Sequence, residues 1–481
     1  MTTHHVDMLI NNEDVATGKL EEVRDPGRLS DVVGTVTQGT AEHVDQAVRA
    51  AHQAFLSWRK VSLEERSALI LKAADLLEQE GDALAPILTR ESGALLSAYR
   101  TEFKAAANTI RGIVKVAQSA LNPQQYEDNN TWLSVEPVPL GVVAALTPWN
   151  VPITIAMNKF APVLVTGNTI IIKPSPSSSI AVTMALKKMA SLFPPGVVNV
   201  VHGGADVGVA LTTHPLVRKI TLTGGGRTAT AVMKSASDSL KRVHFELGGN
   251  DPAIILDDAD LEKAIPRIVD AAFFRSGQIC IASKRVYIPA SMYKDACDLF
   301  EQIVGKFKIG HGLDANTTFT PVNNKGQYQF VKDLVERTKQ TRATVLELGE
   351  KLEPDNWDNG YYLKPAVVVN PDPQQEIVVC EQFGPVVPLI PYTSEEEVIR
   401  LANDTEYGLG SIVFSSDFER AVRFSREIEA GMTGINGHQH SSLGSLRPFG
   451  GVKQSGIGWE SGTAGVLEYV NYHSMTYHKN A

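Results

Sequence analysis

Residues 141–175 read GVVAALTPWNVPITIAMNKFAPVLVTGNTIIIKPS, with a short apolar run on either side of a longer one. The short runs, at 142–146 and 169–172, consist of β-branched and small aliphatic residues, as buried strands do. The longer run, 152–165, begins with a proline and suits a helix in length and spacing. This order predicts a strand, a helix and a second strand of one parallel sheet.

The same alternation continues to residue 247. Further strand-like runs are VVNVVHG, RKITLTGG and RVHFELGG, and the segments between them suit helices. Five alternations of strand and helix predict a parallel sheet with helices on both faces. Ligands of such sheets bind beyond the carboxyl ends of the strands, where the motifs TPWN, KPS, TGGG and ELGG all fall.

The remaining sequence predicts helices, a second sheet and two isolated strand segments. Residues 41–120 have helical spacing, with Gly81 and Pro86 as expected interruptions. A second alternating region begins near Gly249. The segments 125–139 and 465–478 are strand-like and rich in aromatic residues, and strands outside either core are often oligomer contacts. The helices expected in the second region lie near 261–274, 292–307 and 395–403.

The composition narrows the class of partner. The chain has 481 residues, 43% of them hydrophobic, which is enough for two or three domains with separate cores. A net charge of -9 and a pI near 5.8 argue against nucleic acid or an anionic membrane as the main partner. We therefore expect a small-molecule substrate and self-association.

The number and spacing of the cysteines and the start of the chain favour a protein located in the reducing cytoplasm. The three cysteines, at 280, 297 and 380, form neither a disulfide framework nor a Cys-x-x-Cys metal pattern. We find no signal peptide and no apolar run long enough to cross a bilayer. His4 and His5 could begin a metal site, but we expect them in a polar, mobile terminus and predict no metal centre.

Three motifs at predicted strand ends carry candidate ligand-binding residues, each with a structural alternative. Asn150 in TPWN is either a turn residue or an amide donor to an oxyanion. Lys173 in IIIKPS is either a solvated lysine or a partner of a ribose hydroxyl or phosphate. The glycines 224–226 of LTGGGR either make a tight turn or bind phosphate at a helix start, with Arg227 at hand.

Two glutamates and one cysteine could likewise have either a structural or a catalytic role. Glu246 in HFELGGND ends a strand beside a glycine turn, where a carboxylate either forms a buried ion pair or transfers protons with a raised pKa. Glu381 in CEQFGP allows both interpretations. Cys280 in FFRSGQICIAS, taken alone, is more often a small core residue than a nucleophile.

Taken together and in this order, the motifs resemble the aldehyde dehydrogenase superfamily. The matching stretches are TPWN, KPS, LTGG, FELGGNDP, GQIC, EQFGP and PFGGVKQSGIGWESG, and they extend over nearly the whole chain. The resemblance implies an NAD(P)-dependent enzyme that does not use coenzyme A, closest to bacterial members of broad specificity. It also implies an α/β fold with a Rossmann-like cofactor domain, a second α/β catalytic domain and a small β oligomerisation element. The expected boundaries are 1–122 with 140–247, then 248–445, and 123–139 with 446–481.

The resemblance assigns roles to five catalytic residues. Cys280 would attack the aldehyde to form a thiohemiacetal and, after hydride transfer, a thioester. Asn150 and the backbone N–H of Cys280 would form the oxyanion hole, and Glu246 would activate the hydrolytic water. Lys159 matches a family lysine, and Glu460 matches a carboxylate proposed to relay protons with Glu246.

The cofactor implied by the resemblance is NAD or NADP. Glu381 is expected to hold the nicotinamide ribose, with Phe383 packed near it, and Lys173 to contact the adenosine ribose. The residues expected at the cofactor site are Trp149, Lys173, Ser175, Pro176, Gly224, Gly225, Leu247, Glu381 and Phe383.

Three departures from the family pattern bear on specificity. Pro176 replaces a carboxylate that would bind both hydroxyls of the adenosine ribose, so we expect NADP to be accepted beside NAD. Ala229 stands where the phosphate turn normally has a second glycine. The segment 436–449 is longer than usual in the family, so we assign no substrate role within 438–446.

An apolar set of residues is expected at the substrate channel, which favours aliphatic or aromatic aldehydes. These residues are Val151, Phe274, Ile279, Ile281 and Phe449. Succinic-semialdehyde branches tend to carry an arginine where Phe274 stands, although Arg275 and Arg447 could bind a carboxylate.

Two rival functions remain at this level. A semialdehyde dehydrogenase that acylates coenzyme A typically lacks the hydrolytic glutamate, which is present here as Glu246. A catalytically silent relative would be expected to have lost Cys280, Glu246 or Asn150. We expect a cytoplasmic homodimer or homotetramer that acts on a small aldehyde.

Overall fold

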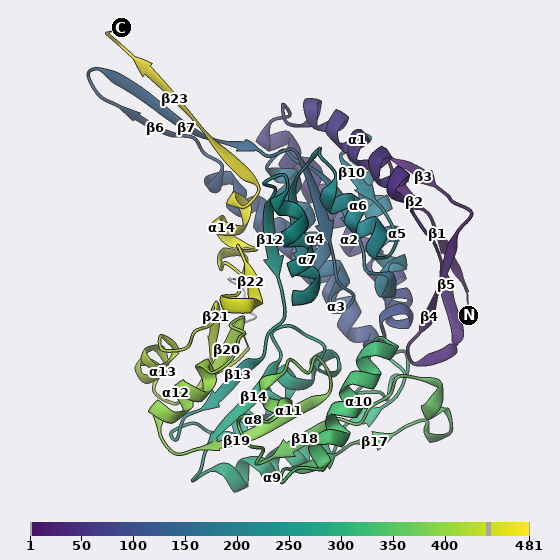
Figure 1. Cartoon of the computed structure of the whole chain (residues 1–481), viewed down its shortest axis with the longest axis vertical. Coiled ribbons are helices and arrows are strands. Elements are labelled where there is room, and N and C mark those ends of the chain that lie inside the picture. The colour runs from purple at the N-terminus through teal and green to yellow at the C-terminus, as the bar shows by residue number, and fades with distance from the viewer. Residues whose placement is uncertain (1, 439–443, 481) are drawn as a thin grey trace.

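The computed structural model describes residues 2–438 and 444–480, and its main features are two open α/β sheets stacked end to end (Figure 1). The first sheet has eight strands in the order β22-β12-β11-β8-β9-β10-β2-β3. Its five central strands are parallel, and β2, β3 and β22 pair antiparallel at the edges. The strands are β2 (Met8–Ile10), β3 (Glu13–Val15), β8 (Val142–Leu146), β9 (Thr169–Lys173), β10 (Val198–Val200), β11 (Val217–Thr223), β12 (Arg242–Glu246) and β22 (Gly456–Ile457).

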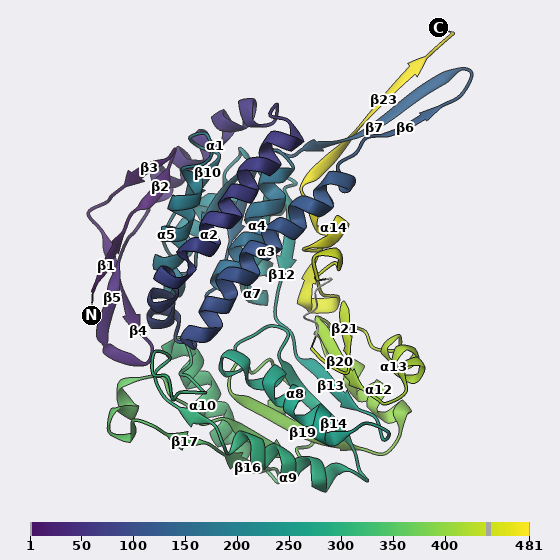
Figure 2. The ribbon, with the colours of Figure 1, turned by 180° about the vertical axis from the view of Figure 1, so that it is seen from behind.

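Helices cover both faces of the first sheet, as the alternating pattern predicts (Figure 2). One face packs against α2, α3, α4 and α5, and the other against α1, α6 and α7. The helices are α1 (Ala41–Trp58), α2 (Leu63–Ser92), α3 (Leu96–Ala120), α4 (Pro152–Val165), α5 (Ile180–Ala190), α6 (Ala205–Thr213) and α7 (Gly226–Ser237).

The expected interruptions at Gly81 and Pro86 are wrong, because α2 runs without a break through both positions. Packing explains the continuity, since α2 buries residues on both sides of the proline, such as Ala85 and Leu88. A Cβ on Gly81 would lie 2.9 Å from Cβ of Phe103, so the glycine allows α2 and α3 to pack closely.

The second sheet has seven strands in the order β16-β18-β19-β14-β13-β20-β21, all parallel except β16. The strands are β13 (Asp251–Ile255), β14 (Ser283–Pro289), β16 (Thr344–Glu347), β18 (Ala366–Val369), β19 (Val386–Tyr392), β20 (Gly410–Phe414) and β21 (Met432–Ile435). The helices are α8 (Leu261–Phe273), α9 (Tyr293–Val304), α10 (Lys325–Lys339), α11 (Glu376–Val379), α12 (Glu395–Asn403) and α13 (Phe418–Ser425). The predicted α/β fold class is confirmed.

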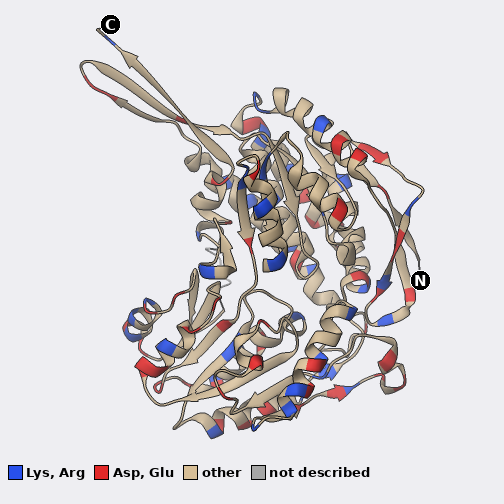
Figure 3. Ribbon diagram, viewed as in Figure 1, with Lys and Arg blue, Asp and Glu red and all other residues tan. Residues whose placement is uncertain are grey.

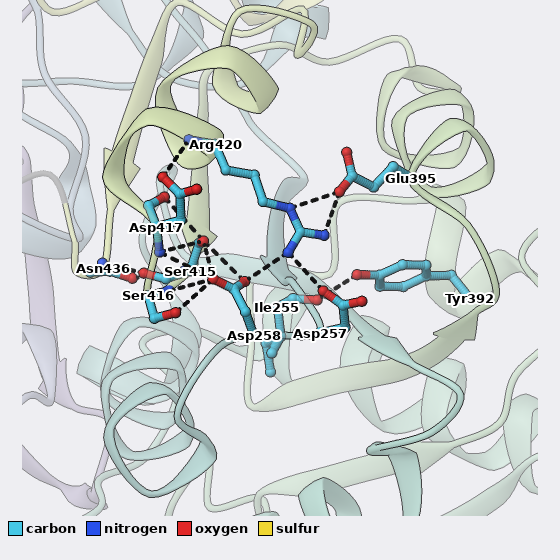
Figure 4. A network of polar contacts seen from close by, with 10 residues as sticks. All are labelled: Ile255, Asp257, Asp258, Tyr392, Glu395, Ser415, Ser416, Asp417, Arg420 and Asn436. Carbon is cyan, nitrogen blue, oxygen red and sulfur yellow. Dashed lines mark hydrogen bonds and ion pairs between the residues drawn. The ribbon is translucent and has the colours of Figure 1, made fainter.

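Arg420 of α13 connects the loop after β13 to the start of α12 at the carboxyl edge of the second sheet (Figure 4). Its guanidinium donates to Asp257 at 2.7 Å, to Asp258 at 3.1 Å and to Glu395 at 2.9 Å. These carboxylates follow β13 and begin α12, so the network fixes that edge of the sheet.

A three-stranded antiparallel sheet, β23-β7-β6, projects from the body of the molecule (Figures 1 and 2). It consists of β6 (Gln124–Glu127), β7 (Thr131–Pro139) and β23 (Val470–His478). The start of the segment 465–478 differs from the prediction, since residues up to 467 belong to α14 (Gly462–Leu467).

The N-terminal residues form a sheet of their own rather than the expected mobile terminus. It contains β1 (His4–Val6), β4 (Leu20–Asp25) and β5 (Arg28–Thr37). His5 is held by Thr35, with Nδ1 and Oγ1 2.9 Å apart. The remaining short elements are β15 (Lys308–Ile309), β17 (Glu350–Lys351) and the 3-10 turns η1 (Pro176–Ser178), η2 (Phe274–Gly277), η3 (Pro354–Asn359), η4 (Gly444–Leu446) and η5 (Lys453–Ser455).

Charged residues of both signs are interspersed over the two α/β units (Figure 3). Within residues 2–438 and 444–480, no helix is both long and apolar enough to cross a membrane. The same ranges contain no group of three or more His, Cys, Asp or Glu side chains arranged to hold a metal ion.

Candidate active site

A cavity of about 250 Å³ lies between the two sheets, at the carboxyl ends of β8, β11 and β12. It brings together eight of the residues singled out in the sequence, three others that lie within the quoted motifs, and Gln327, which lies outside them. The lining residues are Pro148, Trp149, Asn150, Thr223, Gly224, Gly225, Leu247, Gly248, Cys280, Gln327, Glu381 and Phe383.

Asn150 is fixed by the loop that carries Cys280. β8 ends at Leu146, and α4 begins only at Pro152, so Asn150 projects from the strand's carboxyl edge. Its side-chain Nδ2 donates to the carbonyl of Gln278 at 2.9 Å, and its own carbonyl accepts from Arg275 Nη1 at 2.7 Å. A carboxamide has two N–H donors, so one remains for a ligand at the cavity.

Cys280 follows a strained turn and is half-buried. The two residues Arg275 and Ser276 have left-handed φ angles of 52° and 56°, which reverses the chain before the cysteine. Burial raises the pKa of the Cys280 thiol well above its usual range, and the carboxylates of Glu246 and Asp251 raise it further. The resting thiol is therefore protonated and needs a base to become a nucleophile.

Glu246 is buried and has no hydrogen-bond partner on either carboxylate oxygen among the described residues. Burial raises its pKa well above the usual value, the negative charge of Glu460 raises it further, and Lys159 opposes them. A carboxylate in this state is a stronger base than an ordinary glutamate.

Lys159 and Glu460 form a buried ion pair next to Glu246. Lys159 Nζ lies 2.6 Å from Glu460 Oε1, and the two side chains are 0% and 4% exposed. Asn158 Nδ2 donates to the other oxygen of Glu460 at 2.9 Å. α4 supplies the lysine and the asparagine, and the turn after β22 supplies the glutamate.

Glu381 enters the cavity because Gly248 has no side chain. A Cβ on Gly248 would overlap the carboxylate of Glu381, whose Oε1 accepts from the Gly249 N–H at 3.0 Å. Burial raises the pKa of Glu381 to about 7. Phe383 has a left-handed φ of 44°, and its ring meets that of Trp149 edge-on with centroids 5.6 Å apart.

Lys173, Ser175 and Pro176 lie at the end of β9, outside the residues that line this cavity. Burial lowers the pKa of Lys173 to about 8, and the carboxylates of Asp206 and Glu21 oppose that shift. Pro176 begins η1 and lines a small depression together with Glu21.

The predicted substrate residues fall into two groups. Ile279, Ile281 and Phe449 pack with Cys280 in one apolar cluster. Phe274 is instead 44% exposed and lines a cavity of about 490 Å³ between α3, α8 and α9. Val151 lies next to Asn150 at the start of α4. The loop residues 439–443 lie outside the described ranges.

Arg275 is occupied within the protein. Its guanidinium donates to Glu102 Oε2 at 2.7 Å and lies over the Tyr99 ring, 4.5 Å from the centroid. With its charge paired and buried, this arginine does not face a substrate carboxylate.

Sequence reasoning missed several residues of the site. Glu102, on α3, accepts from the N–H groups of Ile153 and Thr154 and pairs with Arg275, yet its only sequence signal is a charge on the apolar side of a helix. Gln327 holds the carbonyl of Phe383 at 2.9 Å and carries no signal in its neighbourhood. Asp251 lies within the FELGGNDP stretch, but no role was expected for it.

The chain is similar to known proteins over nearly its whole length. The sequence profile described as the aldehyde dehydrogenase family matches residues 14–475. The chain is 35% identical to succinate-semialdehyde dehydrogenase [NADP(+)] 1 of Schizosaccharomyces pombe, over 96% of this chain and 92% of that protein. It is 35% identical to the α-ketoglutaric semialdehyde dehydrogenase of Bacillus subtilis, over 93% and 92%. The crystal structure of betaine aldehyde dehydrogenase from Staphylococcus aureus in complex with NAD+ superposes with a TM-score of 0.94 at 31% identity, covering 99% of this chain and 95% of that one.

Proposed function

Because this chain belongs to the aldehyde dehydrogenase family and uses NAD or NADP, we propose that it oxidises an apolar aldehyde to its carboxylic acid through Cys280. The observation that carries the proposal is the grouping of a cysteine, an amide donor and a buried carboxylate around one cavity. Cys280 and Asn150 line it, and Glu246 lies close enough to raise the pKa of the cysteine.

The residues around the cavity fit a dinucleotide cofactor. α7 begins at Gly226, with Gly225 as its N-cap, and an added Cβ on either glycine would meet no atom within 4 Å, so the backbone is open to a phosphate. We assign the nicotinamide ribose to Glu381, whose pKa of about 7 leaves it able to accept or share a proton. We assign the adenosine ribose to Lys173 at the end of the neighbouring strand. When bound, this cofactor would supply the acceptor for the hydride that leaves the substrate carbon.

The chain's own residues supply the covalent chemistry. The proton of the Cys280 thiol passes to solvent through water in the cavity, and the thiolate adds to the aldehyde carbon. The free N–H of the Asn150 amide and the backbone N–H of Cys280 stabilise the oxyanion that forms. After the oxidation, Glu246 removes a proton from water as that water attacks the thioester, which releases the acid and the cysteine.

The apolar surroundings of Cys280 favour an aliphatic or aromatic aldehyde. Ile279, Ile281 and Phe449 pack with Cys280 and contribute no polar group to a substrate. Arg275 is paired with Glu102 and cannot compensate the charge of a dicarboxylic semialdehyde.

A semialdehyde is the second candidate substrate. Two relatives that are 35% identical carry the names of semialdehyde dehydrogenases. Arg447, which is half-buried at the end of η4, is the cation that would bind the substrate carboxylate.

Activity on a panel of aldehydes distinguishes an apolar aldehyde from a semialdehyde as the preferred substrate. We expect a higher kcat/KM for hexanal and benzaldehyde than for succinic semialdehyde, measured by the formation of reduced cofactor without coenzyme A. Cys280→Ser should abolish turnover while cofactor binding, measured by fluorescence, stays intact. A wild-type preference for succinic semialdehyde that Arg447→Met removes would establish the second candidate instead. Wild-type rates in Cys280→Ser would contradict both.

A further inference from the structure

Lys284 is a buried cation to which the proposed reaction assigns no role. It is the second residue of β14, four residues after Cys280, and it is 2% exposed. A charged side chain that is removed from water has to be compensated by hydrogen bonds or by an opposite charge. The contacts of its ammonium therefore show which parts of the protein it holds.

The ammonium donates to three backbone carbonyls. Its Nζ lies 2.6 Å from the carbonyl oxygen of Gly384, 3.2 Å from that of Ala272 and 3.4 Å from that of Val386. An ammonium has three N–H donors, so this set engages all of them. Ala272 is in the last turn of α8, and Val386 begins β19. Lys284 thus connects the end of that helix with the start of that strand.

Both connected elements adjoin loops of the active cavity. The segment 274–280, the cysteine loop, follows α8 and ends at Cys280. The segment 381–385, the glutamate loop, precedes β19 and carries Glu381, which lines the cavity. Lys284 therefore joins the cysteine loop to the glutamate loop and is not itself among the residues that line the cavity.

Gly277 brings the cysteine loop into direct contact with the ammonium. Its φ of 71° is left-handed, and an added Cβ would lie 2.4 Å from Lys284 Nζ and 2.2 Å from the carbonyl oxygen of Gly384. Both distances are shorter than a real Cβ contact, so these two atoms already fill the space next to Gly277. The backbone of the cysteine loop therefore packs directly on the ammonium and on the glutamate loop.

Strained backbone in both loops depends on support of this kind. Arg275 and Ser276 in the cysteine loop have φ angles of 52° and 56°, and Phe383 in the glutamate loop has one of 44°. Residues other than glycine adopt this region at a cost and keep it only where surrounding contacts hold them. Lys284 contacts both loops, so it supports a strained segment on each side.

Gln327 holds the glutamate loop in a different way. Its Nε2 donates to the carbonyls of Gln382 and Phe383 at 2.8 and 2.9 Å. Gln327 belongs to α10, so these bonds attach the glutamate loop to that helix. Lys284, by contrast, attaches the glutamate loop to the cysteine loop.

The proposed reaction requires the two loops at a fixed distance. The hydride leaves a carbon that is attached to Cys280 Sγ, and the nicotinamide ribose is assigned to Glu381. Transfer between two bound partners is sensitive to a misplacement of about 1 Å. The distance between the loops should therefore affect hydride transfer more than thioester hydrolysis, which involves Glu246 and water.

We propose that Lys284 is a positioning residue, which sets the hydride-transfer geometry by holding the cysteine loop against the glutamate loop. Burial lowers the pKa of Lys284 to about 7, and the charge of Glu381 opposes that shift. Burial raises the pKa of Glu381 to about 7, against the hydrogen bond from Gly249 and the charge of Lys284. The two groups are thus near enough for each charge to act on the other. This inference rests on the proposed function, because it concerns the hydride transfer of the same reaction.

The test is a stopped-flow experiment on the full chain with NAD and hexanal that carries hydrogen or deuterium on the aldehyde carbon. Lys284→Met removes the three donors and nearly keeps the length of the side chain. It should slow the burst of reduced cofactor about tenfold or more, because the loops are no longer held together. The deuterium isotope effect on steady-state turnover should rise above the wild-type value, since hydride transfer then limits the rate.

A purely structural role of Lys284 predicts a different result. Loss of folded protein lowers the amplitude of the burst and leaves its rate constant and isotope effect unchanged. Arg66→Met is the matched control, because Arg66 is another buried cation that donates to backbone carbonyls, those of Val61 and Val165. Val165 is at the opposite end of α4 from Asn150, so this variant should lower stability without changing the burst rate.

Lys284→Gln provides an intermediate case. Its amide keeps two N–H donors but is one atom too short to reach all three carbonyls, so it should slow the burst less than Lys284→Met does. If Lys284→Met does not fold, a slower burst at full amplitude in Lys284→Gln supports the inference on its own.

A wild-type burst rate and isotope effect in the Lys284 variants that fold would overturn the inference. So would equal slowing of the burst by Lys284→Met and Arg66→Met. Absence of any burst in the wild type would contradict the proposed function and not the role of Lys284 alone.

Discussion

At Glu246, the demands of chemistry and of stability oppose each other. Its carboxylate is buried without a partner among the described residues, and its pKa is raised well above the usual value. The folded state therefore holds a proton that the unfolded state has already lost. Stability consequently falls as the pH rises from the ordinary glutamate pKa of 4.5 through the folded value. The same shift makes Glu246 a better base.

The substitution Glu246→Gln separates the effect of the raised pKa on stability from its effect on catalysis. We expect a burst of reduced cofactor followed by turnover slowed about a hundredfold or more, because the amide cannot deprotonate water. The acid limb of the wild-type pH profile, which reflects protonation of Glu246, should lie above the range of an ordinary carboxyl and be absent in the variant. The variant should also melt at a higher temperature than the wild type at pH 8, with a smaller difference at pH 5. Loss of the burst would instead assign Glu246 to the activation of Cys280.

Cofactor choice depends on position 176. Pro176 cannot accept hydrogen bonds from the ribose hydroxyls of NAD and cannot repel the 2′-phosphate of NADP. Lys173 lies three residues away, so we predict that both cofactors are used. Pro176→Glu should raise the ratio of kcat/KM for NAD over NADP about tenfold, which corresponds to about 1.4 kcal/mol.

Glu21 provides the check on this prediction. Its carboxylate belongs to β4 and lines the same depression as Pro176. If the wild type rejects NADP and Glu21→Gln restores its use, Glu21 replaces the missing carboxylate and the prediction for position 176 is wrong.

At the scale of elements, two buried glutamates from distant helices cap the helices that follow the ligand-binding strands. Glu91 of α2 accepts from the N–H groups of Ile180 and Ala181 at the start of α5, each at 2.8 Å. Glu102 of α3 accepts from the first N–H groups of α4 in the same way. The N-cap residues of α4 and α5 make no side-chain cap of their own. The orientation of both helices therefore depends on α2 and α3.

Replacing Glu91 or Glu102 by alanine should have different effects on stability and on kcat. Glu91→Ala should lower the free energy of unfolding by about 1–3 kcal/mol, because buried N–H groups lose their acceptor. Glu102→Ala should cost about 3–5 kcal/mol, since it also leaves the buried charge of Arg275 unpaired. Only Glu102→Ala should lower kcat in the folded fraction, because Arg275 holds the carbonyl of Asn150. Denaturant titration and steady-state kinetics measure the two effects, and equal kcat values in both variants would contradict the link to Asn150.

The same elements explain what the sequence could and could not predict. The strand ends at TPWN, KPS and ELGG follow from local pattern, because apolar runs, prolines and glycines fix where strands stop. The caps from Glu91 and Glu102 arise from tertiary contacts between residues about fifty or more positions apart, for which a single sequence has no signal. The interruption expected at Pro86 is wrong for a related reason, since packing against neighbouring helices overrides the local preference of proline. The set of residues around Cys280 was therefore more predictable than their hydrogen-bond partners.

At the scale of the molecule, the sheet β23-β7-β6 projects from the body of the structure and carries exposed aromatic side chains. Tyr126, Tyr472 and Tyr477 on it are 57%, 62% and 62% exposed. Exposed aromatic residues on strands with free edges favour contact with another chain, so we maintain the prediction of a homodimer or homotetramer.

Charge placed on this sheet should weaken the assembly. Tyr472→Glu is expected to shift the protein to a smaller species, because a carboxylate at an apolar contact must be desolvated. Light scattering coupled to size exclusion measures the mass. Leu240→Glu is the matched control, as Leu240 is 91% exposed but lies on the turn before β12 and should not change the mass. A monomeric wild type, or equal masses for all three proteins, would refute the prediction.

The edge strand β22 has a consequence for how the enzyme is made. β12 pairs with residues 456 and 457, and the partner of Lys159 is Glu460, so the surroundings of Glu246 include residues from late in the chain. During translation the other seven strands of the first sheet leave the ribosome long before those residues do. A nascent chain thus exposes Cys280 before Glu246 is enclosed and before Lys159 has a counter-ion. The surroundings of Glu246 are therefore complete only after residues 456–460 have been synthesised.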